Sequence, residues 1–214
     1  LSSFTIAIDS KELVQQKVRE AADFPILKIK VGLENDREMI ETVREITDKP
    51  LCVDANEGWK TREKALESIN WLKDKNILFV EQPMPADQLE DAKWLRDRSE
   101  IPLLADESVH HLSDVPRLAE AFDRINIKLM KSGGLREAIK MIHTAKALKM
   151  KVMMGCMIET SVGISAAAQL SPLLDYLDLD GNVLISDDPF DGCRNVKGRL
   201  ELTEKAGLCV EPRD

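Results

Sequence analysis

Residues 78–106, LFVEQPMPADQLEDAKWLRDRSEIPLLAD, contain the unit that decides the fold. The apolar run Leu78–Glu81 has the length and composition of a buried strand. The segment Leu89–Arg98 has apolar residues at helical spacing, and a second apolar run, Leu103–Asp106, follows it. Both runs end in a carboxylate. The unit therefore predicts two parallel strands joined by a helix, with an acidic residue at the end of each strand.

The same alternation extends along most of the chain. Strands are expected at Phe4–Ile8, Leu27–Val31, Leu51–Asp54, Leu78–Glu81, Leu103–Asp106, Ile125–Leu129, Val152–Cys156 and Tyr176–Asp180. Helices are expected at Lys11–Ala22, Asp36–Thr47, Arg62–Lys73, Leu89–Arg98, Val115–Ala121, Leu135–Leu148 and Gly163–Leu174. This order predicts an α/β fold, a TIM-type (β/α)7β barrel. An open doubly wound sheet is the alternative, but it usually has a Gly-rich turn after its first strand, and the sequence has none there.

The chain is expected to divide into a barrel and a tail. Residues 1–181 form the predicted barrel, in which Ser10 and Thr61 are expected to be helix N-caps. Residues 182–214 have no eighth helical pattern. In this C-terminal tail, Gly198–Leu202 and Leu208–Glu211 are expected to be short strands that pack outside the barrel.

The composition argues against several classes of function. The 214 residues include 30 basic and 38 acidic side chains, a formal charge of −8, and the two signs are mixed along the chain. This pattern argues against a nucleic-acid surface. No apolar run approaches the roughly 20 residues that a membrane helix needs. The four cysteines have no zinc-site spacing and are expected to be free thiols, so a cytoplasmic location is the default expectation.

Charged residues end several predicted strands, and in parallel barrels the strand ends are where active sites lie. Asp54, Glu81 and Asp106 each follow an apolar run on three successive strands. A single carboxylate in such a place is usually a solvated cap. Three together would repel each other unless a cation held them, and oxygen ligands of this kind suit Mg²⁺. They are therefore the expected metal ligands for one Mg²⁺.

Two lysines flank the predicted metal site. Lys30 lies near the end of the second strand and Lys128 near the end of the sixth, and these strands lie opposite each other in an eight-stranded barrel. A planar enolate between them would have one amine above it and one below. One lysine would remove a proton and the other would return it on the opposite side, which inverts the stereocentre. The pattern predicts Lys30 and Lys128 as the catalytic acid and base.

Strand eight contains a second acidic pair, Asp178 and Asp180, which share one side of the predicted strand. Two carboxylates away from the metal call for another cation. A dipeptide with its carboxylate on the metal and its ammonium group on these aspartates would meet that need. A turn or helix-capping role for Asp-Leu-Asp-Gly remains equally open.

Five motifs on successive strands resemble the enolase superfamily, in its muconate-lactonizing subgroup. They are Lys28-Ile29-Lys30, Val53-Asp54-Ala55-Asn56, Val80-Glu81-Gln82-Pro83, Ala105-Asp106-Glu107-Ser108 and Asn126-Ile127-Lys128-Leu129. Such sites use a Lys or His base with Mg²⁺. By resemblance, the metal ligands are Asp54, Glu81 and Asp106, and the acid/base pair is Lys30 and Lys128.

Met157-Ile158-Glu159-Thr160 and Asp178-Leu179-Asp180 are similar to the dipeptide epimerases of the L-Ala-D/L-Glu type. The resemblance implies a Mg-dependent isomerase that epimerises dipeptides by two-base 1,1-proton transfer. It also implies that the dipeptide substrate would be lined by Thr5, Lys28, Cys156, Met157, Ile158, Asp178 and Asp180. Members of the family begin with an N-terminal capping domain, which is missing from this chain and whose loops select the substrate. The chain also departs from the family at Cys156, where a small polar residue is expected, and at Gly207-Leu208-Cys209.

Other functions remain open at this level. A lyase or cycloisomerase of the same superfamily, such as an o-succinylbenzoate synthase or a muconate cycloisomerase, would use the same lysines and metal without needing the strand-eight pair. A non-catalytic barrel fragment without its cap is a third reading. A Lys128 Schiff-base aldolase would leave the three carboxylates unexplained. The oligomeric state is open, and a homo-oligomer is one possibility.

Overall fold

The computed structural model describes residues 1–213; Asp214, the end of the predicted tail, lies outside the described residues. Eight parallel strands form one sheet in chain order. A parallel bridge between Ser2 and Leu177 joins the start of the chain to the last strand, so the sheet returns on itself as a barrel. The strands are β1 Phe4–Ile6, β2 Leu27–Lys30, β3 Leu51–Asp54, β4 Ile77–Glu81, β5 Leu103–Ala105, β6 Arg124–Lys128, β7 Lys151–Gly155 and β8 Tyr176–Asp178.

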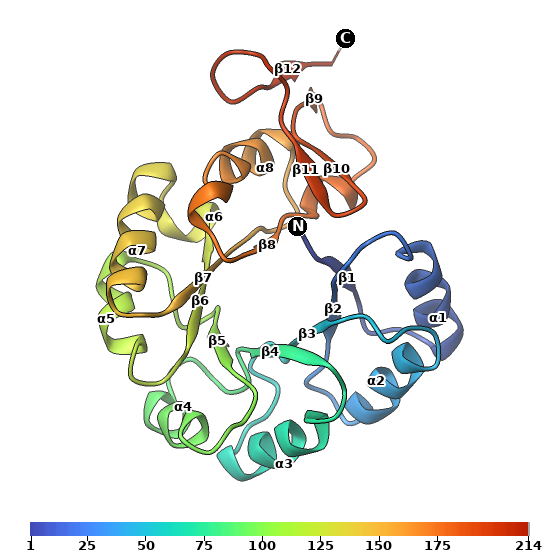
Figure 1. The fold of residues 1–214 in the computed structure, drawn as a ribbon, viewed down its shortest axis with the longest axis vertical. Helices are drawn as coiled ribbons and strands as arrows, with labels where there is room; N and C mark the ends of the chain where they lie inside the picture. The colour runs from blue at the N-terminus through green and yellow to red at the C-terminus, as the bar shows by residue number, and fades with distance from the viewer. Residues whose placement is uncertain (214) are drawn as a thin grey trace.

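Helices surround the sheet as an outer ring (Figure 1). Each of the first seven strands is followed by at least one helix, and within residues 1–213 no α-helix follows β8. The predicted (β/α)7β barrel is therefore confirmed. The helices are α1 Lys11–Glu20, α2 Asp36–Arg44, α3 Arg62–Leu72, α4 Leu89–Arg96, α5 Val115–Leu118, α6 Leu129–Ser132, α7 Leu135–Ala147 and α8 Ser161–Ala168, with 3-10 turns η1 Leu112–Asp114, η2 Ser171–Leu173 and η3 Gly181–Val183.

Local sequence explains where the helices begin and which side they bury. Ser10 and Thr61 have extended backbones, and their hydroxyls accept hydrogen bonds from the amides of Leu13 and Lys64, which confirms both predicted N-caps. In α7 the buried side chains recur at three- and four-residue steps, so one stripe of the helix packs on the sheet. They are Ala138, Met141, Ile142 and Ala145.

The barrel interior has an apolar layer below a polar layer. Cys52, Phe79, Leu104 and Met153 pack together, with Tyr176 against them. Because side chains alternate along a strand, residues two positions further on point to the same side of the sheet. On β3, β4 and β8, and just after β5, these residues begin the polar layer; they are Asp54, Glu81, Asp178 and Asp106.

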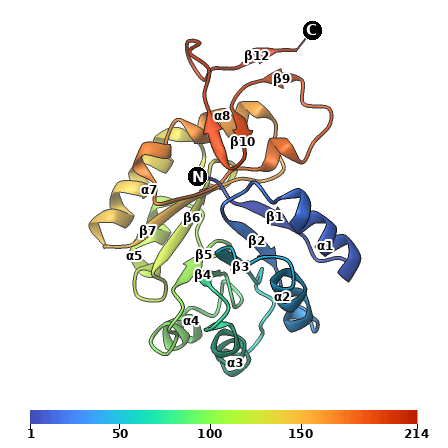
Figure 2. The same ribbon diagram turned by 45° about the vertical axis from the view of Figure 1, so that its right-hand side comes forward.

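The tail forms two small sheets of its own. β10 (Arg194–Val196) pairs with β11 (Arg199–Glu201), and β9 (Phe190–Asp191) pairs with β12 (Glu211–Pro212). Figure 1 places β10 and β11 between α8 and α1, where an eighth helix would lie in a complete barrel, and Figure 2 shows β10 beside α8. The Ser2 amide donates to the Gly198 carbonyl at 2.6 Å, which ties this hairpin to the first strand.

The sequence overestimated the length of several elements. α5 ends at Leu118 instead of the predicted Ala121, and β8 ends at Asp178 instead of Asp180. Asp180 occupies the N-cap position of η3, where its side chain makes no capping hydrogen bond. The strands β9 and β10 were not predicted. Within residues 1–213, no helix is both long and apolar enough to cross a membrane, and the four cysteines are free, as expected.

Candidate active site

Three carboxylates meet at the carboxyl end of the barrel. Asp54 ends β3, Glu81 ends β4 beside it, and Asp106 follows β5 by one residue. One oxygen from each lies within 4.8 Å of the other two, and the three residues are at most 2% exposed. We call these residues the acidic triad. The structure thus brings together the three residues that the sequence predicted as metal ligands.

Within residues 1–213, one carboxylate oxygen of the acidic triad, Glu81 Oε2, is left without a hydrogen bond from the protein. Burial and the neighbouring Asp54 carboxylate raise the pKa of Glu81 to about 8. Glu81 Oε2 has no hydrogen-bond partner, although Lys28 Nζ lies 2.8 Å from it. The contact is therefore a charge contact without hydrogen-bond geometry, and it leaves lone pairs on that oxygen. A divalent cation with a preference for oxygen ligands fits this donor set.

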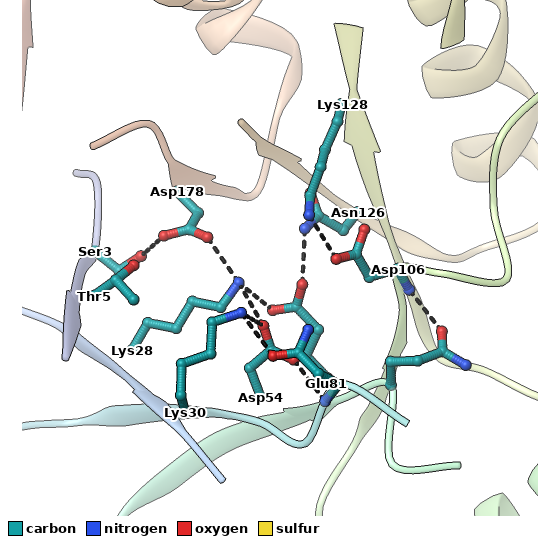
Figure 3. A network of polar contacts seen from close by, with 12 residues as sticks. Ser3, Thr5, Lys28, Lys30, Asp54, Glu81, Asp106, Asn126, Lys128 and Asp178 are labelled. Carbon is teal, nitrogen blue, oxygen red and sulfur yellow. Dashed lines mark hydrogen bonds and ion pairs between the residues drawn. The ribbon is translucent and has the colours of Figure 1, made fainter. Parts of the chain in front are cut away.

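The two predicted acid/base lysines contact different members of the acidic triad. Lys30 Nζ lies 2.7 Å from Asp54 Oδ2, and Lys128 Nζ lies 2.6 Å from Asp106 Oδ2. Burial alone would lower the pKa of Lys128, but the Asp106 carboxylate raises it above its usual value. β2 and β6 are four strands apart in the barrel, and Figure 3 shows the two side chains reaching the carboxylates from different sides.

Lys28 lies deeper than Lys30 on the same strand. It is 3% exposed, and its ammonium nitrogen lies 3.0 Å from Asp54, 2.8 Å from Glu81 and 2.8 Å from Asp178. Burial opposes its charge, yet these carboxylates raise the pKa of Lys28 well above its usual value. Lys28 was expected to line the substrate site; here its ammonium group is enclosed by three carboxylates.

The two aspartates of strand eight have different surroundings. Asp178 pairs with Lys28 and accepts a 2.6 Å hydrogen bond from the Ser3 hydroxyl. Asp180 accepts a hydrogen bond from the Thr5 amide at 2.9 Å. Burial and the Asp178 carboxylate raise the pKa of Asp180. Asp178 therefore already pairs with a cation of the protein, Lys28, and the expected contact of both aspartates with a substrate ammonium group stays a prediction.

The loop after β7 borders Asp180. The Cys156 thiol lies 3.3 Å from the Asp178 carbonyl oxygen and 3.9 Å from Asp180 Oδ1, and burial raises the pKa of this thiol to about 12. Met157 and Ile158 follow it with exposed side chains. A side chain in place of Gly181 would collide with the Met157 carbonyl oxygen, which explains a glycine after Asp180.

Comparisons with known proteins agree with this geometry. The family model described as "Enolase C-terminal domain-like" matches residues 9–214. The chain belongs to this family. It is 53% identical over 210 residues to an L-Ala-D/L-Glu epimerase of Bacteroides thetaiotaomicron, and the match covers 98% of the chain and 55% of that protein. It is 47% identical over 219 residues to an L-Ala-D/L-amino acid epimerase of Pedosphaera parvula, covering 100% of the chain and 63% of that protein.

Solved structures give the same result for the fold. A dipeptide epimerase from Cytophaga hutchinsonii, complexed with Mg and D-Ala-L-Val, superposes with a TM-score of 0.93 at 32% identity, over 99% of this chain and 61% of that one. A substrate-liganded L-Ala-D/L-Glu epimerase from Bacillus subtilis superposes with a TM-score of 0.91 at 32% identity, over 97% of this chain and 62% of that one. The chain therefore spans slightly more than half of the length of these enolase-family relatives.

This member of the enolase C-terminal domain-like family has site residues that the sequence reasoning missed. Lys131, on α6, lies 2.5 Å from Asp106 Oδ1. Asn126 donates to Glu81 Oε1 at 2.8 Å. Its position two residues before Lys128 was the available signal, since alternation places both inside the barrel. Gln82 Oε1 accepts from the Asp106 amide at 2.9 Å, which holds that loop against β4.

Proposed function

We propose that this chain is the barrel domain of a Mg²⁺-dependent dipeptide epimerase that works by two-base 1,1-proton transfer. The observation that carries the proposal is the arrangement of Lys30 and Lys128. They come from opposite strands, and each contacts a different carboxylate of the acidic triad, at 2.7 and 2.6 Å. A substrate carbon held between them would have an amine on each of two sides, which is the arrangement that inversion requires.

The acidic triad would hold Mg²⁺ through Asp54, Glu81 and Asp106. When bound there, the ion would bind the substrate carboxylate and lower the cost of negative charge beside the α-carbon. The chain's own residues would move the proton. One of Lys30 and Lys128 would take it from the α-carbon, which becomes planar, and the other would return a proton from the opposite side. Asn126 and Gln82 would keep Glu81 and Asp106 oriented through their hydrogen bonds.

The substrate ammonium group is best matched by Asp180. This carboxylate is 4% exposed, and no ion pair to it occurs within residues 1–213, whereas Asp178 is already paired with Lys28. Asp178 would support this end of the site through Lys28. Thr5 and Cys156 lie beside Asp180, and the exposed side chains of Met157 and Ile158 would contact the substrate side chains.

The relatives point to the class of substrate. Two relatives, 53% and 47% identical, are described as an L-Ala-D/L-Glu epimerase and an L-Ala-D/L-amino acid epimerase, and a third, from a Flavobacteria bacterium and 36% identical, is described as a hydrophobic dipeptide epimerase. We infer an L-Ala-Xaa dipeptide, with L-Ala-D/L-Glu as the first pair to test. We also infer a reducing compartment, the cytoplasm, because all four cysteines are free.

The test is to incubate the full-length protein with L-Ala-D-Glu and Mg²⁺ in D₂O. Proton NMR should show loss of the Glu α-proton signal, and chiral chromatography should show L-Ala-L-Glu carrying deuterium. Lys64→Ala is the matched control for the lysine variants, because Lys64 is exposed on α3 and, within residues 1–213, forms an ion pair with Glu67 alone. If the full-length protein exchanged no α-proton of L-Ala-Xaa dipeptides, the proposal would fail. If the protein instead eliminated water from a substrate, its function would be that of a lyase.

A further inference from the structure

A second charged site lies at the other end of the barrel, and its centre is Arg124. This arginine begins β6 and is 8% exposed. Within residues 1–213 its guanidinium makes no ion pair within 4.0 Å, and its Nη1 is buried without a hydrogen-bond partner. A buried cationic donor without a partner is costly, because it has lost water and gained no replacement.

Lys151 places a second positive charge beside Arg124. Arg124 and Lys151 are register partners on the parallel strands β6 and β7, so their side chains leave the sheet on the same side. Both approach the ring of Tyr176, the guanidinium carbon at 4.8 Å and the ammonium nitrogen at 5.8 Å from its centroid. The ring of Phe79, which lies on β4, is centred 5.2 Å from the same guanidinium carbon. Nη1 is buried, but Nε and Nη2 are not, and within residues 1–213 neither donates a hydrogen bond, so these two groups form the edge that a ligand could reach.

The nearby carboxylates are engaged elsewhere. Asp123 accepts from Arg96 Nε and from the Leu103 amide, both at 2.9 Å. Asp175, just before β8, accepts from the Val152 amide at 2.9 Å. Neither forms an ion pair with Arg124 or Lys151 in the described part of the chain, so the positive charge of this pair is uncompensated.

A surface hollow of about 410 Å³ adjoins the pair and is bordered by further basic residues, Arg96 and Lys149. It lies where β6 and β7 begin, whereas the acidic triad lies where the strands end. The chain as a whole has a formal charge of −8, whereas this hollow is lined by four basic residues and one acidic residue, Asp123, which is paired with Arg96. Arginine with free N–H donors and a neighbouring lysine is a typical site for a carboxylate or phosphate oxyanion.

We propose that Arg124 and Lys151 bind a small oxyanion of the phosphate class at the amino-terminal end of the barrel. The guanidinium edge would donate to two of its oxygens, and the Lys151 ammonium would balance the remaining charge. This site is separate from the proposed catalytic centre and does not depend on the function proposed for it.

Inorganic phosphate is the probe, measured by isothermal titration calorimetry on the full-length protein at constant ionic strength with EDTA present. The wild type should bind one phosphate saturably. Lys151→Gln, at an exposed position that should not disturb folding, and Arg124→Met, which keeps an apolar side chain against the two rings, should each weaken binding about tenfold or more. Lys64→Gln removes one exposed charge at the opposite end of the barrel and should bind as the wild type does.

Three results would overturn the proposal. They are the absence of saturable binding, equal affinity in Lys151→Gln and the wild type, and loss of binding in Lys128→Met, which would place the anion at the carboxyl end of the barrel. A rise in the thermal midpoint with phosphate that disappears in Lys151→Gln would be independent support, since a ligand of the native state stabilises it.

Discussion

The ammonium nitrogen of Lys28 lies 2.8 Å from Asp178 Oδ2, and this ion pair joins strand eight to the acidic triad. The same nitrogen contacts Asp54 and Glu81, so one buried cation serves three carboxylates from three strands. The proposed metal site and the proposed ammonium site therefore share a structural support. Figure 3 shows this connection through the centre of the barrel mouth.

Replacing Lys28 should make folding depend on Mg²⁺. Lys28→Met removes the cation but keeps an apolar side chain of similar length, which leaves buried carboxylates uncompensated. We expect the free energy of unfolding without metal to fall by about 3–5 kcal/mol. Added Mg²⁺ should recover part of this loss, because it supplies positive charge to Asp54 and Glu81. Denaturant unfolding with and without Mg²⁺ measures both effects; an unchanged midpoint in EDTA would contradict the role given to Lys28.

Removing one member of the acidic triad should remove the response to Mg²⁺. In the wild type, Mg²⁺ at one hundred times its Kd should stabilise the fold by about 2.7 kcal/mol. Glu81→Gln should abolish this shift in thermal unfolding. Glu107→Gln is the matched control, since Glu107 follows Asp106 directly but bonds to Asn56 at 2.9 Å and lies outside the triad. Equal Mg²⁺ shifts in the two variants would mean that the ion binds elsewhere.

Each lysine of the proposed acid/base pair should be needed for inversion but not for all proton exchange. We expect Lys30→Ala and Lys128→Ala to lower epimerisation by a factor of about 10² to 10⁴ or more, the usual contribution of general acid/base catalysis. Each variant should still exchange the α-proton of the one epimer that faces its remaining lysine. Deuterium incorporation into L-Ala-L-Glu and L-Ala-D-Glu, followed separately by NMR, checks this. Loss of exchange with the same epimer in both variants would exclude one base on each side.

The barrel could be predicted because its signal is local and repeated. β3 has the predicted bounds, Leu51–Asp54, since a short apolar run between a proline and a carboxylate leaves little choice of register. The convergence of the acidic triad followed from the fold itself, because parallel strands bring their carboxyl ends to one rim. β9 and β10 were missed because strands of two or three residues show no periodicity.

Contacts across the barrel could not be predicted from the sequence. Lys28 and Asp178 are 150 positions apart, and only the width of the barrel and the length of a lysine side chain decide that they meet. The pairing of Asp178 with a lysine of the protein was therefore not foreseen, and the expected role of Asp178 at the substrate stays a prediction. The position of Asp180 also differs from the prediction, because β8 ends at Asp178, two residues before its predicted end, and Asp180 is the N-cap residue of η3.

The contact between Asp188 and α8 should hold the tail against the barrel. Asp188 Oδ2 accepts from the Ser161 amide at 2.7 Å and from its hydroxyl at 2.6 Å. Asp188→Ala removes the carboxylate that accepts from the Ser161 amide and hydroxyl. The loss should lower the free energy of unfolding by about 1–3 kcal/mol. Asp187→Ala, at the exposed neighbouring position, should change it little. Limited proteolysis should cut the tail of Asp188→Ala faster than that of Asp187→Ala. Equal cleavage of the two variants would show that this contact does not anchor the tail.

The Asp188 contact should also weaken in acid. Burial alone would raise the pKa of Asp188, but hydrogen bonds from Ser161 hold it below its usual value of 3.8. Because the folded pKa lies below the unfolded one, the contribution to stability is fully present above about pH 3.8 and is lost as the pH falls through the folded pKa. The difference in unfolding free energy between wild type and Asp188→Ala should therefore be constant near pH 6 and shrink below pH 3.8. A difference that grew in acid would show that Asp188 stabilises the tail in its protonated form.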